Sequence, residues 1–133
     1  MSAASRTKGM TGERELARLI ADATGYDVRR RVRQHDGDSD LVGVPGWCIE
    51  AKRRRSTTRG EIGSWWAQTV AQARDGIPVL FYRVDRQPWR AVWPLSLIAA
   101  KLDNPIGAYQ WSEYAWTCES TIEAWACVMR EHS

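Results

Sequence analysis

The chain has 133 residues, of which 44% are hydrophobic and 26% charged, and its 19 Lys and Arg against 16 Asp and Glu give a net charge of +3. This length fits one domain, residues 1–133, and this composition excludes a wholly disordered chain. The apolar runs are strand-sized and the N-terminus lacks the apolar stretch of a secretory signal, so we expect a cytoplasmic protein with no membrane-spanning segment.

Segments of helical and strand pattern alternate along the first hundred residues. The first helix is expected to be capped by Thr11 and ended by Gly25. In chain order the predicted elements are a helix over residues 12–23, strands over 26–33, 38–44 and 47–53, a helix over 61–74, strands over 77–84 and 89–93, and a short helix over 94–101. The segment 77–84 is almost continuously apolar, which indicates a strand covered on both faces.

The last thirty residues are rich in tryptophan and tyrosine. Ser120 and Glu123 form a capping-box pair for a final helix, in which Trp125 lies on the apolar face. We expect Trp111, Trp116 and Trp125 to cover a sheet edge, contact a second copy or stack on unpaired bases, and the other tryptophans to pack in the core. The order predicts an α/β domain with a central mixed sheet of about five strands flanked by helices, a core over residues 8–102 and a Trp-rich helical extension over 103–133.

Positive charge is concentrated in the N-terminal half. Residues 1–66 hold 13 basic and 9 acidic residues, a balance of +4, whereas residues 67–133 hold 6 and 7, a balance of −1. The basic groups are Arg29, Arg30, Arg31 and Arg33, and then Lys52, Arg53, Arg54, Arg55 and Arg59. Clusters of this kind neutralise phosphates in nucleic-acid binding, although a solvated charged face has the same composition.

Acidic residues and a lysine gather in the same half. Glu50 and Lys52 are two apart on a predicted strand, so their side chains leave the same face. Asp40 lies on the preceding strand and shares that face with Glu50 only if the connecting loop has an odd number of residues. Glu13 lies at the edge of the buried stripe of the first helix, where it either compensates the helix dipole or contributes to a catalytic site.

This set of residues suits metal-assisted chemistry. Converging carboxylates repel each other unless a cation lies between them, and all-oxygen ligands are typical of Mg²⁺ or Mn²⁺. A neighbouring lysine can stabilise charge that develops on a phosphate, and flanking arginines can hold the nucleic-acid backbone. Together the residues predict hydrolysis of phosphodiester bonds.

Asp40, nine intervening residues and then Glu50-Ala51-Lys52, between two predicted helices, resemble the motif of the PD-(D/E)XK nuclease superfamily. The start of the first helix, Gly12-Glu13-Arg14-Glu15, is similar to that of Holliday-junction resolvases of archaeal and phage type. The likeness covers residues 8–94 and implies a restriction-endonuclease-like core. It departs from the usual pattern at Ser39, where Pro is common, and Asp36 and Asp38 are additional acids nearby.

The resemblance implies a role for each matching residue. Asp40, Glu50 and the backbone carbonyl of Ala51 would bind the metal, Lys52 would position or activate the attacking water, and Glu13 would contribute to a metal or its waters. A glutamine of the second helix also lies near the site in several members; Gln68 fits the family's spacing and Gln72 lies closer to the buried stripe. His35 is a possible proton carrier, although an exposed loop histidine is commoner.

The resemblance also implies the function and the partners. We expect a Mg²⁺- or Mn²⁺-dependent DNA endonuclease, specific for branched DNA and working as a homodimer. The alternatives are a non-catalytic nucleic-acid-binding module of the same fold, a nickase or repair-type nuclease, and a structural subunit that binds another protein through its tryptophans.

Overall fold

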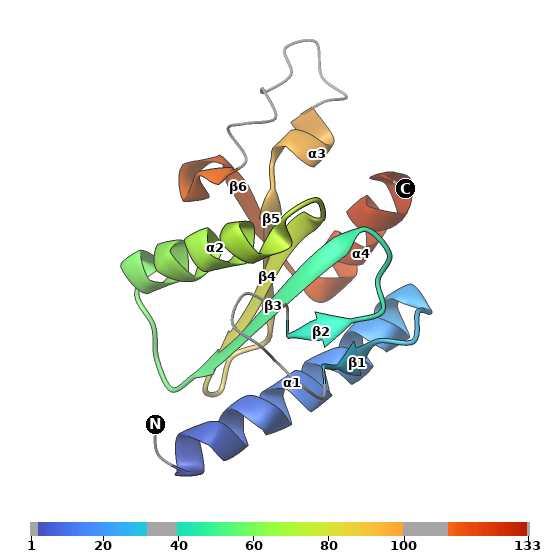
Figure 1. The fold of residues 1–133 in the computed structure, drawn as a ribbon. Helices are drawn as coiled ribbons and strands as arrows, with labels where there is room; N and C mark the ends of the chain where they lie inside the picture. Colours follow the sequence, from blue (N-terminus) through green and yellow to red (C-terminus); the bar gives the residue numbers. More distant parts are fainter. Residues whose placement is uncertain (1–2, 32–39, 100–111, 133) are drawn as a thin grey trace.

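The computed structural model describes residues 3–31, 40–99 and 112–132, which form one six-stranded sheet with helices on both faces (Figure 1). In chain order the elements are α1 (Ala3–Thr24), β1 (Arg29–Arg30), β2 (Leu41–Val42), β3 (Trp47–Arg54), α2 (Arg59–Ala73), β4 (Ile77–Val84), β5 (Arg90–Pro94), α3 (Ser96–Ala99), the 3₁₀ turn η2 (Tyr114–Trp116), β6 (Thr117–Ser120) and α4 (Ile122–His132). The predicted α/β class with a central mixed sheet is confirmed.

The strands follow one another across the sheet in sequence order, from β1 at one edge to β6 at the other. Among the strands of the described residues, β3 and β4 are the one parallel pair, and α2 provides the crossover that such a pair requires. The bounds predicted for β4 agree with the structure, and five of its eight residues are buried, as expected for a strand covered on both faces.

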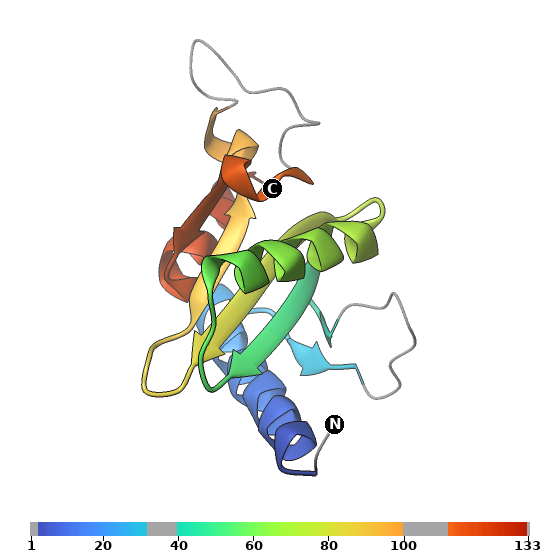
Figure 2. The same ribbon diagram turned by 90° about the vertical axis from the view of Figure 1, so that its left-hand side faces the viewer.

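The sheet has α1 and α4 on one face and α2 on the other (Figures 1 and 2). It separates two apolar cores of different size. On one face α1 and α4 pack against alternate strand residues such as Ile49, Val79 and Phe81. On the other face α2 covers a smaller group, which consists of Ile62, Trp66, Leu80, Tyr82 and Val92. Odd-numbered residues of β3 and β4 therefore face α1 and α4, whereas even-numbered residues face α2.

Several element bounds differ from the sequence-based expectation, the helices predicted from residues 61 and 94 beginning at Arg59 and Ser96. Helix α1 begins at Ala3, so Thr11 lies inside it and does not cap it, because Ala, Arg and Lys in residues 3–10 favour helix. The cap of α4 is Thr121, whose Oγ1 accepts a hydrogen bond from the amide of Ala124 at 3.1 Å, whereas the Ser120 hydroxyl donates to the carbonyl of Thr121. The sixth strand, β6, comes from the segment predicted to be only helical, and it pairs with β5.

The tryptophan of the last helix has a different role from the one expected. Trp125 is fully buried in the larger core, with its ring edge-on to Phe81 at 5.0 Å and to Trp47 at 5.4 Å between centroids. Its burial contradicts a surface role in stacking or dimerisation, while Trp111 lies outside the described residues. None of the helices in the described ranges combines the length and the apolar character needed to cross a bilayer.

Candidate active site

The hairpin of β2 and β3 brings the two acids of the motif together. Leu41 pairs with Ile49, so the antiparallel register places Asp40 opposite Glu50. Seven residues, 42–48, separate Leu41 from Ile49, and this odd number places Asp40 and Glu50 on the same face. Asp40 Oδ2 also accepts a hydrogen bond from the amide of Ala51 at 2.9 Å.

A glycine fixes the position of this hairpin. Gly43 has a positive φ of 123°, and a Cβ there would lie 2.2 Å from the carbonyl oxygen of Asp27. No side chain fits at that distance, so Gly43 allows the hairpin to lie directly against the backbone before β1. The close contact keeps β2, and Asp40 with it, in register beside β3.

Glu50 is a buried ionisable group. Its residue is only 4% exposed, and Lys52 Nζ lies 3.5 Å from Glu50 Oε1. Burial, together with the charge of Asp40 and hydrogen bonding to it, raises the pKa of Glu50 to about 8, although Lys52 opposes this shift. The second carboxylate oxygen, Oε2, is buried and has no hydrogen-bond partner among the described residues.

Helix α1 brings a third carboxylate to the site from the opposite core. Gly12 is buried against β3, and a Cβ there would lie 2.9 Å from Arg53 Cβ, so its lack of a side chain lets the helix approach the strand. Glu13 follows it and accepts a hydrogen bond from Arg30 Nε at 2.6 Å. Because α1 begins ten residues earlier, the expectation that Glu13 compensates the dipole in the first turn is wrong.

Electrostatics show how close Glu13 lies to the motif. Burial and the charge of Asp40 raise the pKa of Glu13, while hydrogen bonding to Arg30 and the charges of Arg30 and Lys52 lower it, with a net upward shift. The charges of two motif residues, Asp40 and Lys52, therefore act on the Glu13 carboxylate. Sequence reasoning missed the partner that orients it, because Arg30 was assigned with its neighbours to DNA binding.

The two glutamines of α2 lie in different environments. Gln68 is exposed. Gln72 is partly buried, its side-chain Oε1 is buried without a hydrogen-bond partner among the described residues, and its backbone carbonyl accepts from Cys48 Sγ at 3.4 Å. The assignment of Gln68 to the site stays a prediction.

The predicted DNA-binding arginines divide into paired and exposed groups. Arg30 pairs with Glu13 and Arg53 pairs with Asp85, and both arginine side chains are at most a quarter exposed. Arg29 pairs with Asp27 on the surface, and Arg31 is partly buried. The exposed members are Arg54, the last residue of β3, and Arg55 and Arg59, which follow the strand. The Arg54 guanidinium lies 5.5 Å from the Trp65 ring centroid.

The oxygen atoms at this site suit a hard divalent cation. Asp40 and Glu50 offer carboxylate oxygens side by side, and the buried, unpartnered Oε2 of Glu50 is the kind of acceptor that a bound cation satisfies. No three His, Cys, Asp or Glu side chains within the described ranges converge as a ready metal cluster, so the site is a carboxylate pair with Glu13 beside it. Some residues that the sequence analysis singled out lie outside the described residues, namely Arg33, His35, Asp36 and Asp38.

Comparison with known proteins gives the class that fits this fold and motif. A family model described as "Phage putative PDDEXK endonuclease" matches residues 4–129, and the chain belongs to this family. The sheet flanked by helices is accordingly a restriction-endonuclease-like core, as the motif implied.

Among solved structures, the chain is similar to Hjc, a Holliday junction resolvase of the archaeal hyperthermophile Archaeoglobus fulgidus. The two are 24% identical, the match covers 63% of this chain and 70% of that chain, and the TM-score is 0.47. A search of curated proteins found no match.

Proposed function

We propose that the protein is a metal-dependent DNA endonuclease that hydrolyses phosphodiester bonds beside Asp40, Glu50 and Lys52. One observation carries the proposal: the buried Glu50 and the partly buried Asp40 lie in register across the β2–β3 hairpin, with a lysine on the same strand face, in a member of an endonuclease family. Burying one carboxylate beside another costs folding free energy, and such a cost is common where a protein binds a cation or performs catalysis.

The chain offers a third oxygen ligand at this position. The amide of Ala51 donates to Asp40, and the N–H and C=O of one strand residue point to the same side. The carbonyl of Ala51 is therefore oriented toward Asp40, where it would complete a Mg²⁺ or Mn²⁺ site with Asp40 and Glu50. When bound, such an ion supplies an acidified water and neutralises charge on the phosphate.

Lys52 and Glu13 have separate roles in this proposal. Lys52 places an ammonium beside Glu50, where it stabilises negative charge that develops on the phosphate oxygens. Glu13, held by Arg30, supplies a carboxylate that accepts protons from waters near the metal ligands. Arg30 acts as a positioning residue for Glu13, because its guanidinium is committed to that ion pair.

The exposed arginines at and after the end of β3 would hold the DNA backbone. Arg54, Arg55 and Arg59 follow Lys52 along the chain and lead into α2, so phosphates on either side of the cleaved bond can reach them. We further propose branched DNA as the substrate, on the resemblance of Gly12-Glu13-Arg14-Glu15 to resolvases, and a symmetric dimer, because cutting two opposed strands requires two sites.

A panel of end-labelled DNA tests the proposal. Four-way junction, forked, single-stranded and duplex DNA are incubated with Mg²⁺, Mn²⁺ or EDTA, and the products are separated on a denaturing gel. The wild type is expected to cut at least one branched DNA with a divalent ion, and Asp40→Asn to lower the rate by about a thousandfold or more, because one charged ligand is lost. Light scattering measures the oligomeric state.

The matched control is Asp22→Asn, which removes the same charge from an exposed position of α1. It is expected to cut at the wild-type rate. Cutting by a folded Asp40→Asn protein at that same rate would disprove the assignment. DNA binding that is unchanged by EDTA, with no cleavage of any substrate, would instead favour the non-catalytic binding module.

A further inference from the structure

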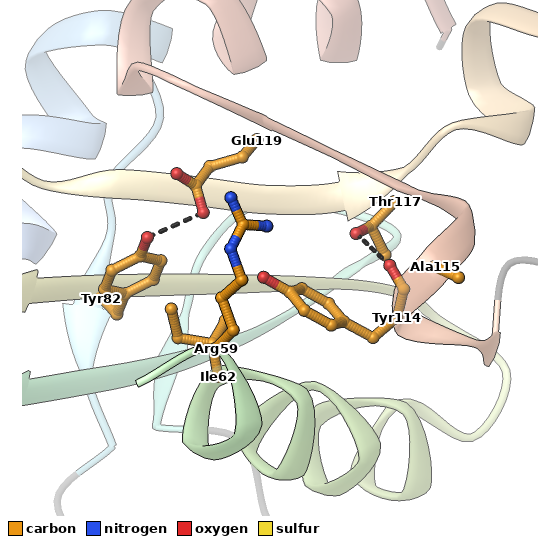
Figure 3. A pocket seen from close by; sticks show the side chains of 7 residues that line it. All are labelled: Arg59, Ile62, Tyr82, Tyr114, Ala115, Thr117 and Glu119. Carbon is orange, nitrogen blue, oxygen red and sulfur yellow. Dashed lines mark hydrogen bonds between the residues drawn. The ribbon is translucent and has the colours of Figure 1, made fainter. Parts of the chain in front are cut away.

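A polar pocket lies on the α2 face of the sheet, the same face as Glu50 and Lys52. It has a volume of about 430 Å³, within the range of small-molecule sites, and lies between the start of α2, β4, the turn η2 and β6 (Figure 3). Its lining residues are Arg59, Ile62, Tyr82, Tyr114, Ala115, Thr117 and Glu119.

The pocket adjoins the proposed active site through the sheet. Tyr82 on β4 is the register partner of Lys52 on β3, and both side chains face α2. Adjacent strands are about 4.8 Å apart, so the pocket begins one strand away from the lysine. A DNA strand with a phosphate at Lys52 can therefore place a neighbouring nucleotide in the pocket.

Three kinds of group meet in this pocket. Tyr114 presents an aromatic ring that packs on Gly63 of α2, and its backbone carbonyl accepts a hydrogen bond from Thr117 Oγ1 at 2.7 Å. Figure 3 shows the Arg59 side chain reaching between Tyr114 and Glu119. Unlike Arg30 and Arg53, Arg59 forms no ion pair or hydrogen bond with any residue in the described ranges.

Glu119 is held in place and keeps capacity to accept further hydrogen bonds. Its Oε1 accepts from the Tyr82 hydroxyl at 2.7 Å and its Oε2 accepts from Arg90 Nε at 3.2 Å. Each carboxylate oxygen has two lone pairs, so both can accept again from a ligand. Because Glu119 is paired with Arg90, the Glu119 carboxylate repels a phosphate less than an isolated carboxylate would.

We infer that this pocket binds one unpaired nucleotide of the DNA strand next to the cleaved bond. The nucleotide matches all three groups: its base lies against the Tyr114 ring, its phosphate pairs with Arg59, and an amino group of the base donates to Glu119. The inference rests on the proposed nuclease function and narrows it, since it makes DNA with unpaired nucleotides the preferred substrate over fully paired duplex.

Binding in EDTA tests the pocket independently of cleavage. Fluorescence anisotropy compares a fork whose unpaired arm contains cytosines with a duplex of the same length, and 2-aminopurine at the first unpaired position reports stacking. The wild type is expected to prefer the fork. Tyr114→Ala and Arg59→Ala should each weaken fork binding about tenfold, and Tyr114→Ala should also abolish the quenching of 2-aminopurine.

The control variants are Tyr26→Ala and Arg18→Ala, which remove the same side chains from exposed positions outside the pocket and should bind as the wild type does. If Tyr114→Ala does not fold, Glu119→Gln provides the second test: the wild type should prefer unpaired cytosine to thymine, which has no amino group, and the variant should lose that preference. Equal affinity of the wild type for unpaired cytosine and thymine would show that Glu119 does not accept a hydrogen bond from the base amino group.

The outcomes separate this inference from the nuclease proposal. Equal affinity of the wild type for fork and duplex, or a fork preference kept by both Arg59→Ala and Tyr114→Ala, overturns the pocket assignment even if the enzyme cuts DNA. Loss of the preference in the variants supports it even if no cleavage is found. Competition by millimolar free deoxycytidine monophosphate, without any fork preference, would show a site for free nucleotides and would also overturn it.

Discussion

The two faces of the sheet differ in how much apolar surface they bury and in how many polar groups they hold. The face under α1 and α4 buries the larger core, in which Trp125, Phe81 and Leu16 are fully enclosed. The face under α2 buries only five core residues and leaves room for charged groups and for the pocket. Glu50, at 4% exposure, lies on this second face.

The α2 face holds the carboxylate that burial and a neighbouring like charge destabilise. Glu50 is buried beside Asp40, and its Oε2 and Gln72 Oε1 lack hydrogen-bond partners among the described residues. Such groups lower the free energy of unfolding, so packing elsewhere in the molecule must offset that loss. We expect the α1 and α4 face to determine stability and the α2 face to determine activity, and mutations on the two faces separate these effects.

The largest effect on stability is expected at Trp125. Trp125→Ala should lower the free energy of unfolding by about 3–5 kcal/mol, because it leaves a cavity between Phe81 and Trp47. Trp65→Ala on the α2 face should cost less, because Trp65 is only partly buried. Urea denaturation followed by circular dichroism measures both.

Trp125→Phe is the matched control. The indole Nε1 of Trp125 is buried without a hydrogen-bond partner in the described part of the chain, so the change removes an unsatisfied donor while keeping an aromatic ring. It should cost clearly less than Trp125→Ala. Equal costs for Trp125→Ala and Trp65→Ala would contradict the proposed division between the faces.

The second prediction concerns the charge of Glu50. Its pKa rises from 4.5 to about 8 on folding, so the native protein holds a proton that the unfolded chain releases. Stability without metal should therefore fall as pH rises from about 4.5 to 8. Glu50→Gln removes this loss and should stabilise the metal-free protein by about 2 kcal/mol at pH 8, below the full linkage value because the amide is also buried.

Added Mg²⁺ should reverse the order, because the ion stabilises only the protein that binds it. The measurement is the thermal midpoint of wild type and Glu50→Gln at pH 5 and pH 8, with EDTA or with Mg²⁺. Asp22→Asn again serves as the control, since Asp22 is exposed. A wild type that is more stable than the variant at pH 8 in EDTA would show that Glu50 is not held at an electrostatic cost.

Local patterns predicted the elements whose residues have a distinct periodicity or composition. β4 was predicted with its observed bounds because its apolar run is continuous, whereas the sequence left the hairpin parity open and the register of Leu41 with Ile49 settles that Asp40 lies opposite Glu50. β6 has four residues, none of them fully buried, and its pairing with β5 is a contact between distant segments. Such a strand has no periodicity of its own, so sequence reasoning missed it.

Local sequence patterns could not predict the pocket either. Arg59, Tyr82 and Glu119 lie far apart in the sequence and meet only because β4, β5 and β6 are neighbours. The arginines show the same limit: Arg30 and Arg53 have the composition of a DNA-binding cluster but pair with Glu13 and Asp85. Only tertiary contacts distinguish these arginines from the exposed ones.

The third prediction concerns Glu15, on the α1 side. Its Oε1 accepts hydrogen bonds from Trp89 Nε1 and Arg83 Nη1, both at 2.6 Å. Burial raises the pKa of Glu15. The hydrogen bonds from Trp89 and Arg83 and the charge of Arg83 lower it by more, so the net shift is downward. A lowered native pKa stabilises the fold above the ordinary value of 4.5, and this contribution is lost as pH falls through the native pKa.

Glu15→Gln should therefore cost about 1 kcal/mol at pH 7, reduced by the partial exposure of the pair, and almost nothing below pH 3. Urea denaturation at several pH values measures the gap. Glu123→Gln, at an exposed position of α4, is the charge control. A gap that stays constant from pH 7 to pH 3 would exclude the ion pair as its source.

The smallest predicted effect concerns the start of α2, which carries Arg59. The Thr58 side chain accepts a hydrogen bond from the Glu61 amide at 3.2 Å, and the Glu61 side chain accepts from the Thr58 amide at 3.1 Å. Thr58→Ala should lower stability by about 0.5–1 kcal/mol, and Thr58→Ser should restore most of it. Because α2 covers the smaller core, hydrogen exchange should accelerate in its first turn and not in α1. Equal acceleration in both helices would show that the two faces unfold as one unit.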